Sequence, residues 1–119
     1  MSFAVTNDKL LSNLLSASAQ RYKVLANNLA NQDTAGYKRS IVRFEDLLAK
    51  ELSATKPDIL SVVPVVEEDL ITPSSPDGNN VNPELELNGM AQNRLQYEMY
   101  SAILSGRAQL LRAAIQGGR

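Results

Sequence analysis

The stretch Asn27–Lys38, which reads NNLANQDTAGYK, marks the point where a long helical pattern stops. Upstream of it, apolar residues recur at helical spacing, and downstream that period vanishes. Asparagine is unfavourable inside a helix because its side chain competes for backbone hydrogen bonds, so three asparagines in five residues fit a helix end. Gly36 permits the positive φ of a turn. The stretch therefore predicts a helix end followed by a glycine turn.

An N-terminal helix is expected over residues 8–31, after a loose arm at residues 1–6. Thr6, Asn7 and Asp8 offer N-cap and first-turn chemistry at its start. The helix carries a heptad-like seam with alternating spacings of four and three: Leu11, Leu15, Ser18, Tyr22, Leu25, Leu29 and Gln32. Because Ser18 and Gln32 interrupt this seam, the helix needs a partner to be stable.

A C-terminal helix is expected over residues 84–116, with Pro83 suited to its first turn and two glycines closing it. One apolar line along it contains Met90, Leu95, Met99, Ile103 and Leu110. An adjoining line contains Tyr97, Tyr100, Leu104, Ala108, Leu111 and Ile115. One partner helix cannot cover both lines. The helix is therefore expected to pack on the N-terminal helix and on neighbouring subunits.

The middle of the chain, residues 32–82, is expected to hold the turn, a short helix over residues 44–52 and an irregular β-prone segment. Residues 59–63 and 65–66 are candidate short strands, broken by Pro64. The acidic run at residues 67–69 is interpreted as a solvated loop. Proline and turn residues dominate residues 53–82, and the pattern leaves the fold of residues 53–76 open.

Length and composition exclude several classes of function. At 119 residues the chain, 1–119, is expected to be one domain. It has no cysteine or histidine, and a formal net charge of −1 argues against binding nucleic acid. No catalytic set, cofactor motif or metal-ligand pattern is found, and no small-molecule substrate is indicated. An EF-hand calcium loop has glycine at its sixth position. If Gly78 took that position, Pro73 would take the first, where a calcium ligand is needed, so the motif does not fit.

Targeting signals are also not found. The first 30 residues have no basic start followed by an apolar run and a small-residue cleavage site. No stretch approaches the length of about 18 apolar residues that a membrane span needs. The chain is expected to be cytoplasmic or to leave the cell by a route that needs no cleaved signal.

The stretch around the helix end resembles the N-terminal signature of the flagellar basal-body rod, hook and hook-associated proteins. The matching residues are Asn27, Asn28, Leu29, Asn31, Thr34, Gly36, Tyr37 and Lys38. Residues 77–82, 90–97 and 106–118 resemble the proximal rod subunits within that family. The resemblance covers about residues 10–45 and 77–118.

The resemblance implies a mainly α fold in which the N- and C-terminal helices form an antiparallel, coiled-coil-like pair. It implies a structural subunit of the proximal rod, on the periplasmic side of the basal body, that self-associates helically and transmits torque toward the hook. The implied partners are other rod subunits, the ring–rod junction protein, the export gate and the membrane ring. Export would use the flagellar apparatus without a cleaved signal peptide.

Two alternatives stay open: another rod-family subunit, or a helical adaptor or export chaperone that binds a partner helix. No set of catalytic residues supports an enzymatic function. The signature asparagines are expected to bond the backbone near residues 34–37 or a neighbouring subunit. Both ends of the chain are expected to fray in the free subunit.

Overall fold

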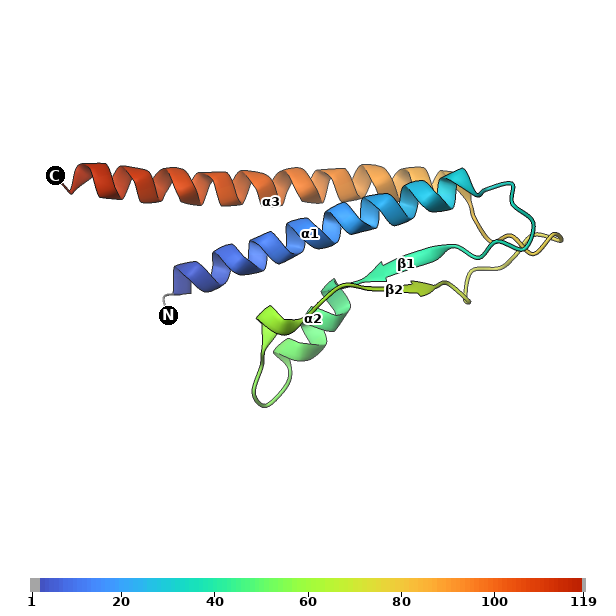
Figure 1. Ribbon diagram of the computed structural model, residues 1–119, viewed down its shortest axis with the longest axis horizontal. Helices are drawn as coiled ribbons and strands as arrows, with labels where there is room; N and C mark the ends of the chain where they lie inside the picture. Colours follow the sequence, from blue (N-terminus) through green and yellow to red (C-terminus); the bar gives the residue numbers. More distant parts are fainter. Residues whose placement is uncertain (1–2, 119) are drawn as a thin grey trace.

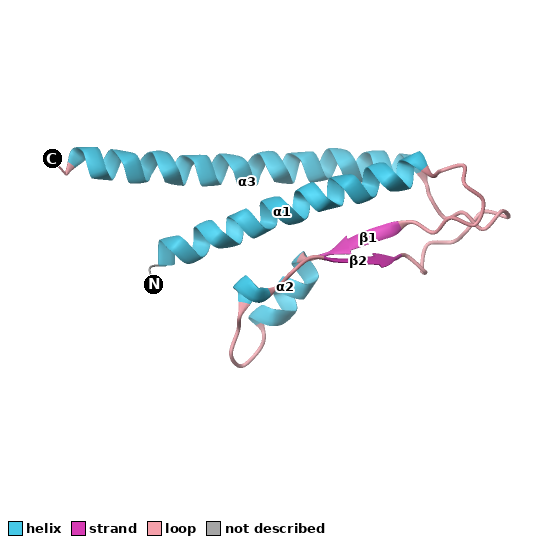
Figure 2. Cartoon of the chain, viewed as in Figure 1, coloured by secondary structure: helices cyan, strands magenta, loops and turns pink. Residues whose placement is uncertain are grey.

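The computed structural model describes residues 3–118 and shows an elongated, flat molecule with extents of 68 × 32 × 14 Å. Two long helices, α1 (Phe3–Ala30) and α3 (Pro83–Gly117), run antiparallel along its length (Figure 1). Between them in sequence lie β1 (Ser40–Arg43), α2 (Glu45–Leu52), the 3-10 helix η1 (Ile59–Ser61) and β2 (Val65–Glu68) (Figure 2). The predicted mainly α fold with an antiparallel helix pair and a short middle helix is confirmed.

The N-terminal helix begins earlier than expected. It starts at Phe3, so the prediction of a loose arm is wrong for residues 3–6, and residues 1 and 2 lie outside the described part. Asp8 does not begin the helix but lies within it, where its Oδ1 accepts a hydrogen bond from Nε of Arg107 on α3 at 2.5 Å. The helix ends at Ala30, one residue before the predicted end.

The start of α3 has a well-formed cap. The side chain of Asn82 accepts hydrogen bonds from the backbone N–H groups of Glu84 and Leu85, and Pro83 occupies the first helical turn. An asparagine cap accepts hydrogen bonds from N–H groups that have no partner within the helix. A proline in the first turn lacks an N–H group, but that group would have had no partner in the helix. The strong cap explains why the chain turns abruptly from loop to helix at this point.

The contact between α1 and α3 is more polar than the apolar pattern suggests. Among described residues, the buried apolar side chains are Ala17, Leu25 and Phe44. Buried polar residues lie on both helices, and the side-chain amide of Asn93 donates to the Ser18 carbonyl at 2.8 Å. Six of the predicted packing residues are half-buried: Leu11, Leu15, Leu29, Met90, Tyr100 and Leu104. Eight others are exposed: Tyr22, Leu95, Tyr97, Met99, Ile103, Leu110, Leu111 and Ile115.

The middle segment forms a two-stranded antiparallel sheet. β1 pairs with β2 in a register that sets Ser40 opposite Glu68 and Arg43 opposite Val65. The prediction of a strand at residues 59–63 is wrong, because residues 59–61 form a 3-10 turn instead. Both the backbone N–H and the hydroxyl of Ser61 donate to the carbonyl of Asp58, which closes that turn.

Across residues 3–118, no helix is both long and apolar enough to cross a bilayer.

Candidate functional site

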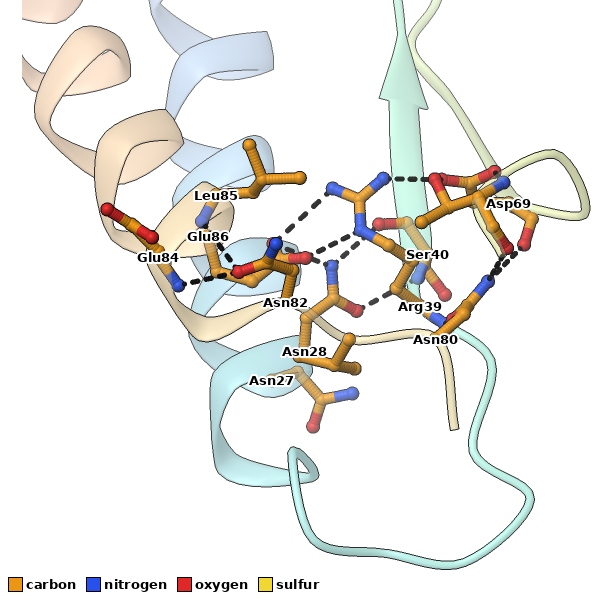
Figure 3. Close-up of polar contacts among 12 residues, drawn as sticks. Asn27, Asn28, Arg39, Ser40, Asp69, Asn80, Asn82, Glu84, Leu85 and Glu86 are labelled. Carbon is orange, nitrogen blue, oxygen red and sulfur yellow. Dashed lines mark hydrogen bonds and ion pairs between the residues drawn. The ribbon is translucent and has the colours of Figure 1, made fainter. Parts of the chain in front are cut away.

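Asn28 is the central residue of the predicted signature, and it is fully buried near the end of α1. Its Nδ2 donates to the carbonyl of Ser40 at 2.8 Å and to Oε2 of Glu86 at 3.2 Å. Its Oδ1 accepts from the backbone N–H of Ser40 at 2.9 Å and from the hydroxyl of Tyr37 at 3.1 Å. The amide thus uses its two donors and two acceptor positions. One side chain therefore ties α1 to both β1 and α3 (Figure 3).

The other signature residues form a local chain of hydrogen bonds. The side-chain amide of Asn27 donates to the Tyr37 hydroxyl at 3.1 Å. That of Asn31 donates to the Asn27 carbonyl at 2.8 Å, and the Thr34 hydroxyl donates to Oδ1 of Asn31 at 3.2 Å. These bonds hold the end of α1 against the turn that follows it.

The expected partners of the asparagines need a correction. The backbone that Asn28 binds belongs to Ser40, beyond the predicted segment 34–37. After the glycine turn the chain runs back alongside α1, so the first residue of β1 reaches Asn28. The turn itself instead contacts the loop that precedes α3.

That contact joins the signature turn to residues 74–80. The backbone N–H of Gly36 donates to the Asp77 carbonyl at 2.9 Å. The side-chain amide of Asn79 donates to two carbonyls of the signature turn, at 2.8 and 2.9 Å. Nζ of Lys38 donates to the Gly78 carbonyl at 2.5 Å. Gly36 has a φ of +74°, which confirms the predicted positive φ.

A buried charge cluster lies beside Asn28 (Figure 3). Arg39 donates through Nε to Oε1 of Glu86 at 2.5 Å and through Nη1 to Oδ2 of Asp69 at 2.6 Å. Glu86 is fully buried, and Asp69 is 8% exposed. Asn80 accepts from the Arg39 backbone N–H and donates to the Asp69 carbonyl, both at 2.7 Å. The cluster holds α3, the residue directly before β1 and the loop after β2 together.

Asp69 is held in its charged form. The side-chain hydrogen bond from Thr72, backbone N–H groups of Thr72 and Ile71, and the Arg39 guanidinium hold the pKa of Asp69 well below its ordinary value, against the opposing effect of burial. The interpretation of residues 67–69 as a solvated loop is therefore wrong: residues 67 and 68 are exposed but belong to β2, and Asp69 is buried. For Arg39, burial opposes the charged form, but the bonds to Glu86 and Asp69 outweigh it and raise the pKa.

An open groove of about 770 Å³ lies between α1 and α3. Its lining includes three large side chains, Tyr22, Met90 and Tyr97. Ser18 and Asn93 also line it, and within the described residues the Ser18 Oγ and the Asn93 Oδ1 are buried without a hydrogen-bond partner. Buried polar atoms in folded proteins almost always have partners. The Ser18 Oγ and the Asn93 Oδ1 are therefore exceptions to this rule, at the buried contact between α1 and α3.

The hydrogen bonds and ion pairs of the site hold separate segments of the fold together. Within residues 3–118 no group of three or more acidic, histidine or cysteine side chains is placed to hold a metal ion. Sequence reasoning missed Arg39, Asp69, Glu86 and Asn93 as site residues. A signal for part of this set was present, because Glu86, Asn93, Tyr100 and Arg107 recur every seven residues on α3.

Comparisons with known proteins point to one family. The family described as "Flagella basal body rod protein" matches residues 12–38, which span most of α1 and the signature turn. Flagellar basal body rod protein FlgB of Bacillus subtilis (strain 168) is 33% identical over 92% of this chain and 92% of its own length.

Two further relatives carry the same name. FlgB of Escherichia coli (strain K12) is 33% identical over 87% of this chain and 88% of its own length. FlgB of Aquifex aeolicus (strain VF5) is 34% identical over 82% of this chain and 83% of its own length. Each of these matches covers more than four-fifths of this chain. The chain belongs to the FlgB family of flagellar basal-body rod proteins.

Proposed function

We propose that this chain is a structural subunit that stacks helically in the proximal rod and passes torque from the membrane ring toward the hook, without catalysing a reaction. Membership of the FlgB family supports the rod role. The buried hydrogen bonds and ion pairs around Asn28 and Arg39 support a role in transmitting force, because they join α1, the start of β1, the loop after β2 and α3.

The observation that carries the assembly proposal is the exposed apolar line on α3. Leu95 and Leu110 are 67% and 72% exposed, and Met99 and Ile103 lie between them on the same side of the helix. Large contiguous apolar patches on a soluble subunit mark interaction surfaces. Burying such a patch stabilises an assembly by roughly 25 cal/mol per Å² of apolar surface. The line would thus be covered by neighbouring subunits in the rod.

Specific partners follow from the same proposal. Besides other copies and other rod subunits, we propose that the chain contacts the ring–rod junction protein, the export gate and the membrane ring. It would reach the periplasmic side of the basal body through the flagellar export apparatus, without cleavage of a signal peptide. The alternative function is that of an adaptor or export chaperone, which would bind a partner helix along the exposed apolar line of α3.

The test is complementation of a bacterium that lacks its own copy of this gene. Wild-type chain should restore swimming and be recovered in purified basal bodies. Leu110→Arg should be expressed and soluble yet absent from basal bodies, because the charge would oppose burial of the apolar line. Gln109→Arg, which adds the same charge at the preceding exposed position, is the matched control and should lose far less.

Two results would overturn the proposal. One is a chain that restores swimming but is never found in basal bodies. The other is a discrete cytoplasmic complex between this chain and an exported protein, which would show an adaptor. Either result would leave the fold intact and change only the function.

A further inference from the structure

Two exposed patches at distant parts of the molecule have complementary chemistry. The tail patch is Leu111, Arg112 and Ile115 on the last turns of α3. The strand patch is Val66 and Glu68 on β2, continued by the two residues Leu70–Ile71. Both combine exposed apolar side chains with one charge, and the two charges have opposite sign.

The tail patch is bare because α1 diverges from α3 toward its N-terminus (Figure 1). All residues from 108 to 118 are exposed, with Leu111 at 62% and Ile115 at 61%. Positions three and four apart share a helix face, so Leu111 and Arg112 both neighbour Ile115. Residues 99–119 contain no acidic side chain, and among the described residues no ion pair involves Arg112.

The strand patch lies on a strand with a free edge. β2 has only β1 as a neighbour in the sheet, and its four residues are all exposed. Val66 and Glu68 point to the same face because side chains alternate along a strand. Beyond β2, Leu70 is 77% exposed and Ile71 is 94% exposed. Within residues 3–118, Glu68 has no ion-pair partner.

The spacings of the two patches match. Alternate side chains on a strand are about 7 Å apart, and side chains three or four apart on a helix are about 5–6 Å apart. Arg112 can therefore pair with Glu68 while Ile115 packs on Val66. A single chain cannot make this contact with itself, since the end of α3 and β2 lie far apart along the 68 Å length of the molecule (Figure 1).

We infer that the tail patch of one copy docks on the strand patch of the next copy. The inference rests on the proposed role as a rod subunit and names the contact by which copies join. Because the two patches differ, each contact leaves one patch free at either end of the pair. Such a heterologous contact continues into an open helical array, whereas a symmetric contact would stop at a dimer.

Cross-linking tests the contact, because the chain has no native cysteine. Ile71→Cys and Ile115→Cys are placed in one full-length chain, and basal bodies are treated with a short bis-maleimide. The double variant should give a ladder of dimers and higher species. A strain that expresses the two single variants together should give dimers only, and either single variant alone should give no cross-link.

Controls separate this inference from the proposed function. Lys56→Cys, on the exposed loop after α2, replaces Ile71→Cys as the matched control and should give no ladder with Ile115→Cys. Chain present in basal bodies without the ladder overturns the tail-to-strand contact and leaves the rod role standing. Dimers from Ile115→Cys alone would show a symmetric contact and would also overturn it. Wild-type chain missing from basal bodies would instead refute the proposed function.

A charge exchange gives an independent measurement. Glu68→Arg and Arg112→Glu should each reduce the swimming halo, because each places like charges across the contact. The chain that carries both changes restores an opposite pair and should recover most of the halo. Full swimming of both single variants, or a double variant as defective as either single one, would overturn the inference.

Discussion

Gly36 and Gly78 lie directly against each other: a Cβ on Gly78 would be 3.3 Å from the Cα of Gly36. Both residues have positive φ, +74° and +88°. Their contact closes the signature turn onto the loop before α3. Gly36 is required for its backbone conformation alone, since a Cβ there would meet nothing within 4 Å, whereas Gly78 is required for both conformation and space.

We therefore expect Gly78→Ala to destabilise the subunit more than Gly36→Ala. Positive φ costs a residue with a Cβ about 1–2 kcal/mol, and Gly78→Ala adds a tight contact to that strain. Urea unfolding followed by circular dichroism measures both free energies. Gly106→Ala is the control: its Cβ would enter open space within α3, so it should stabilise by about 0.5–1 kcal/mol. Equal stability of Gly78→Ala and wild type would contradict this account.

Replacing Asn28 should be the most damaging change in the signature. Asn28→Leu leaves the backbone N–H and carbonyl of Ser40 and the carboxylate of Glu86 without this partner. Glu86 keeps its bonds to Arg39, so the two backbone groups of Ser40 are the ones that lose this partner. Each buried polar group left unpaired costs about 1–3 kcal/mol, so a loss of at least about 2 kcal/mol is expected. Asn27→Ala, at the exposed neighbouring position, should cost less than about 1 kcal/mol. The measurements are the free energy of unfolding and swimming, and normal swimming of Asn28→Leu would contradict the role.

Arg39 should matter far more than an arginine on the surface. Arg39→Met leaves Glu86 charged and buried, which typically costs about 3–5 kcal/mol. Arg94→Met breaks an exposed pair with Glu98, for which a loss of about 0.5 kcal/mol is expected. Adding Glu86→Gln to Arg39→Met should recover part of the lost stability, because it removes the buried charge. Similar unfolding midpoints for Arg39→Met and Arg94→Met would refute this difference.

Acid should destabilise the subunit partly through Asp69. An unfolded aspartate has a pKa of about 3.9, and the Thr72 hydroxyl foremost lowers the pKa of Asp69 in the folded chain. The folded state therefore binds this proton less readily, so its stabilising effect is complete above about pH 5 and is lost as the pH falls below about 4. Asp69→Asn should reduce the difference in unfolding free energy between about pH 6 and pH 3. An unchanged difference would show that Asp69 does not contribute.

Hydrogen exchange should divide α3 into two parts. Residues 86–104 belong to the part of α3 that packs against α1, so their backbone amides should be protected. Residues 108–117 are exposed throughout and should exchange within the shortest labelling times. Protection of the last three turns in a monodisperse monomer would show that the tail is stable without a partner. In purified basal bodies the same tail should become protected, because neighbouring subunits would cover it.

Apolar periodicity was sufficient to predict the two long helices, because α1 and α3 carry it over many turns. The turn was predictable for a different reason, since Gly36 is the residue that tolerates positive φ. Periodicity could not show that β1 pairs with a strand 22 residues further along, because strand pairing between distant segments depends on tertiary packing. The 3-10 turn at residues 59–61 was missed because its apolar run also fits a strand.

The buried polar cluster was the harder part of the site to predict. A search for apolar spacing passes over Glu86 and Asn93, although both lie on the inner side of α3. Asp69 looks like part of an acidic loop until the fold brings Arg39 to it across 30 residues of sequence. Charged residues are rarely buried unless paired, and the sequence does not reveal the pair.

The cross-helix bonds also set how strongly α1 and α3 resist sliding past each other. Asn28–Glu86, Ser18–Asn93 and Asp8–Arg107 lie near one end, in the middle and toward the other end of the α1–α3 overlap. If one helix slid past the other by a single turn, about 5.4 Å, all three bonds would break together. A purely apolar seam would resist such sliding less, because its contacts are non-directional. The three bonds therefore oppose shear between α1 and α3, and the helix pair would keep a fixed length when force acts along it.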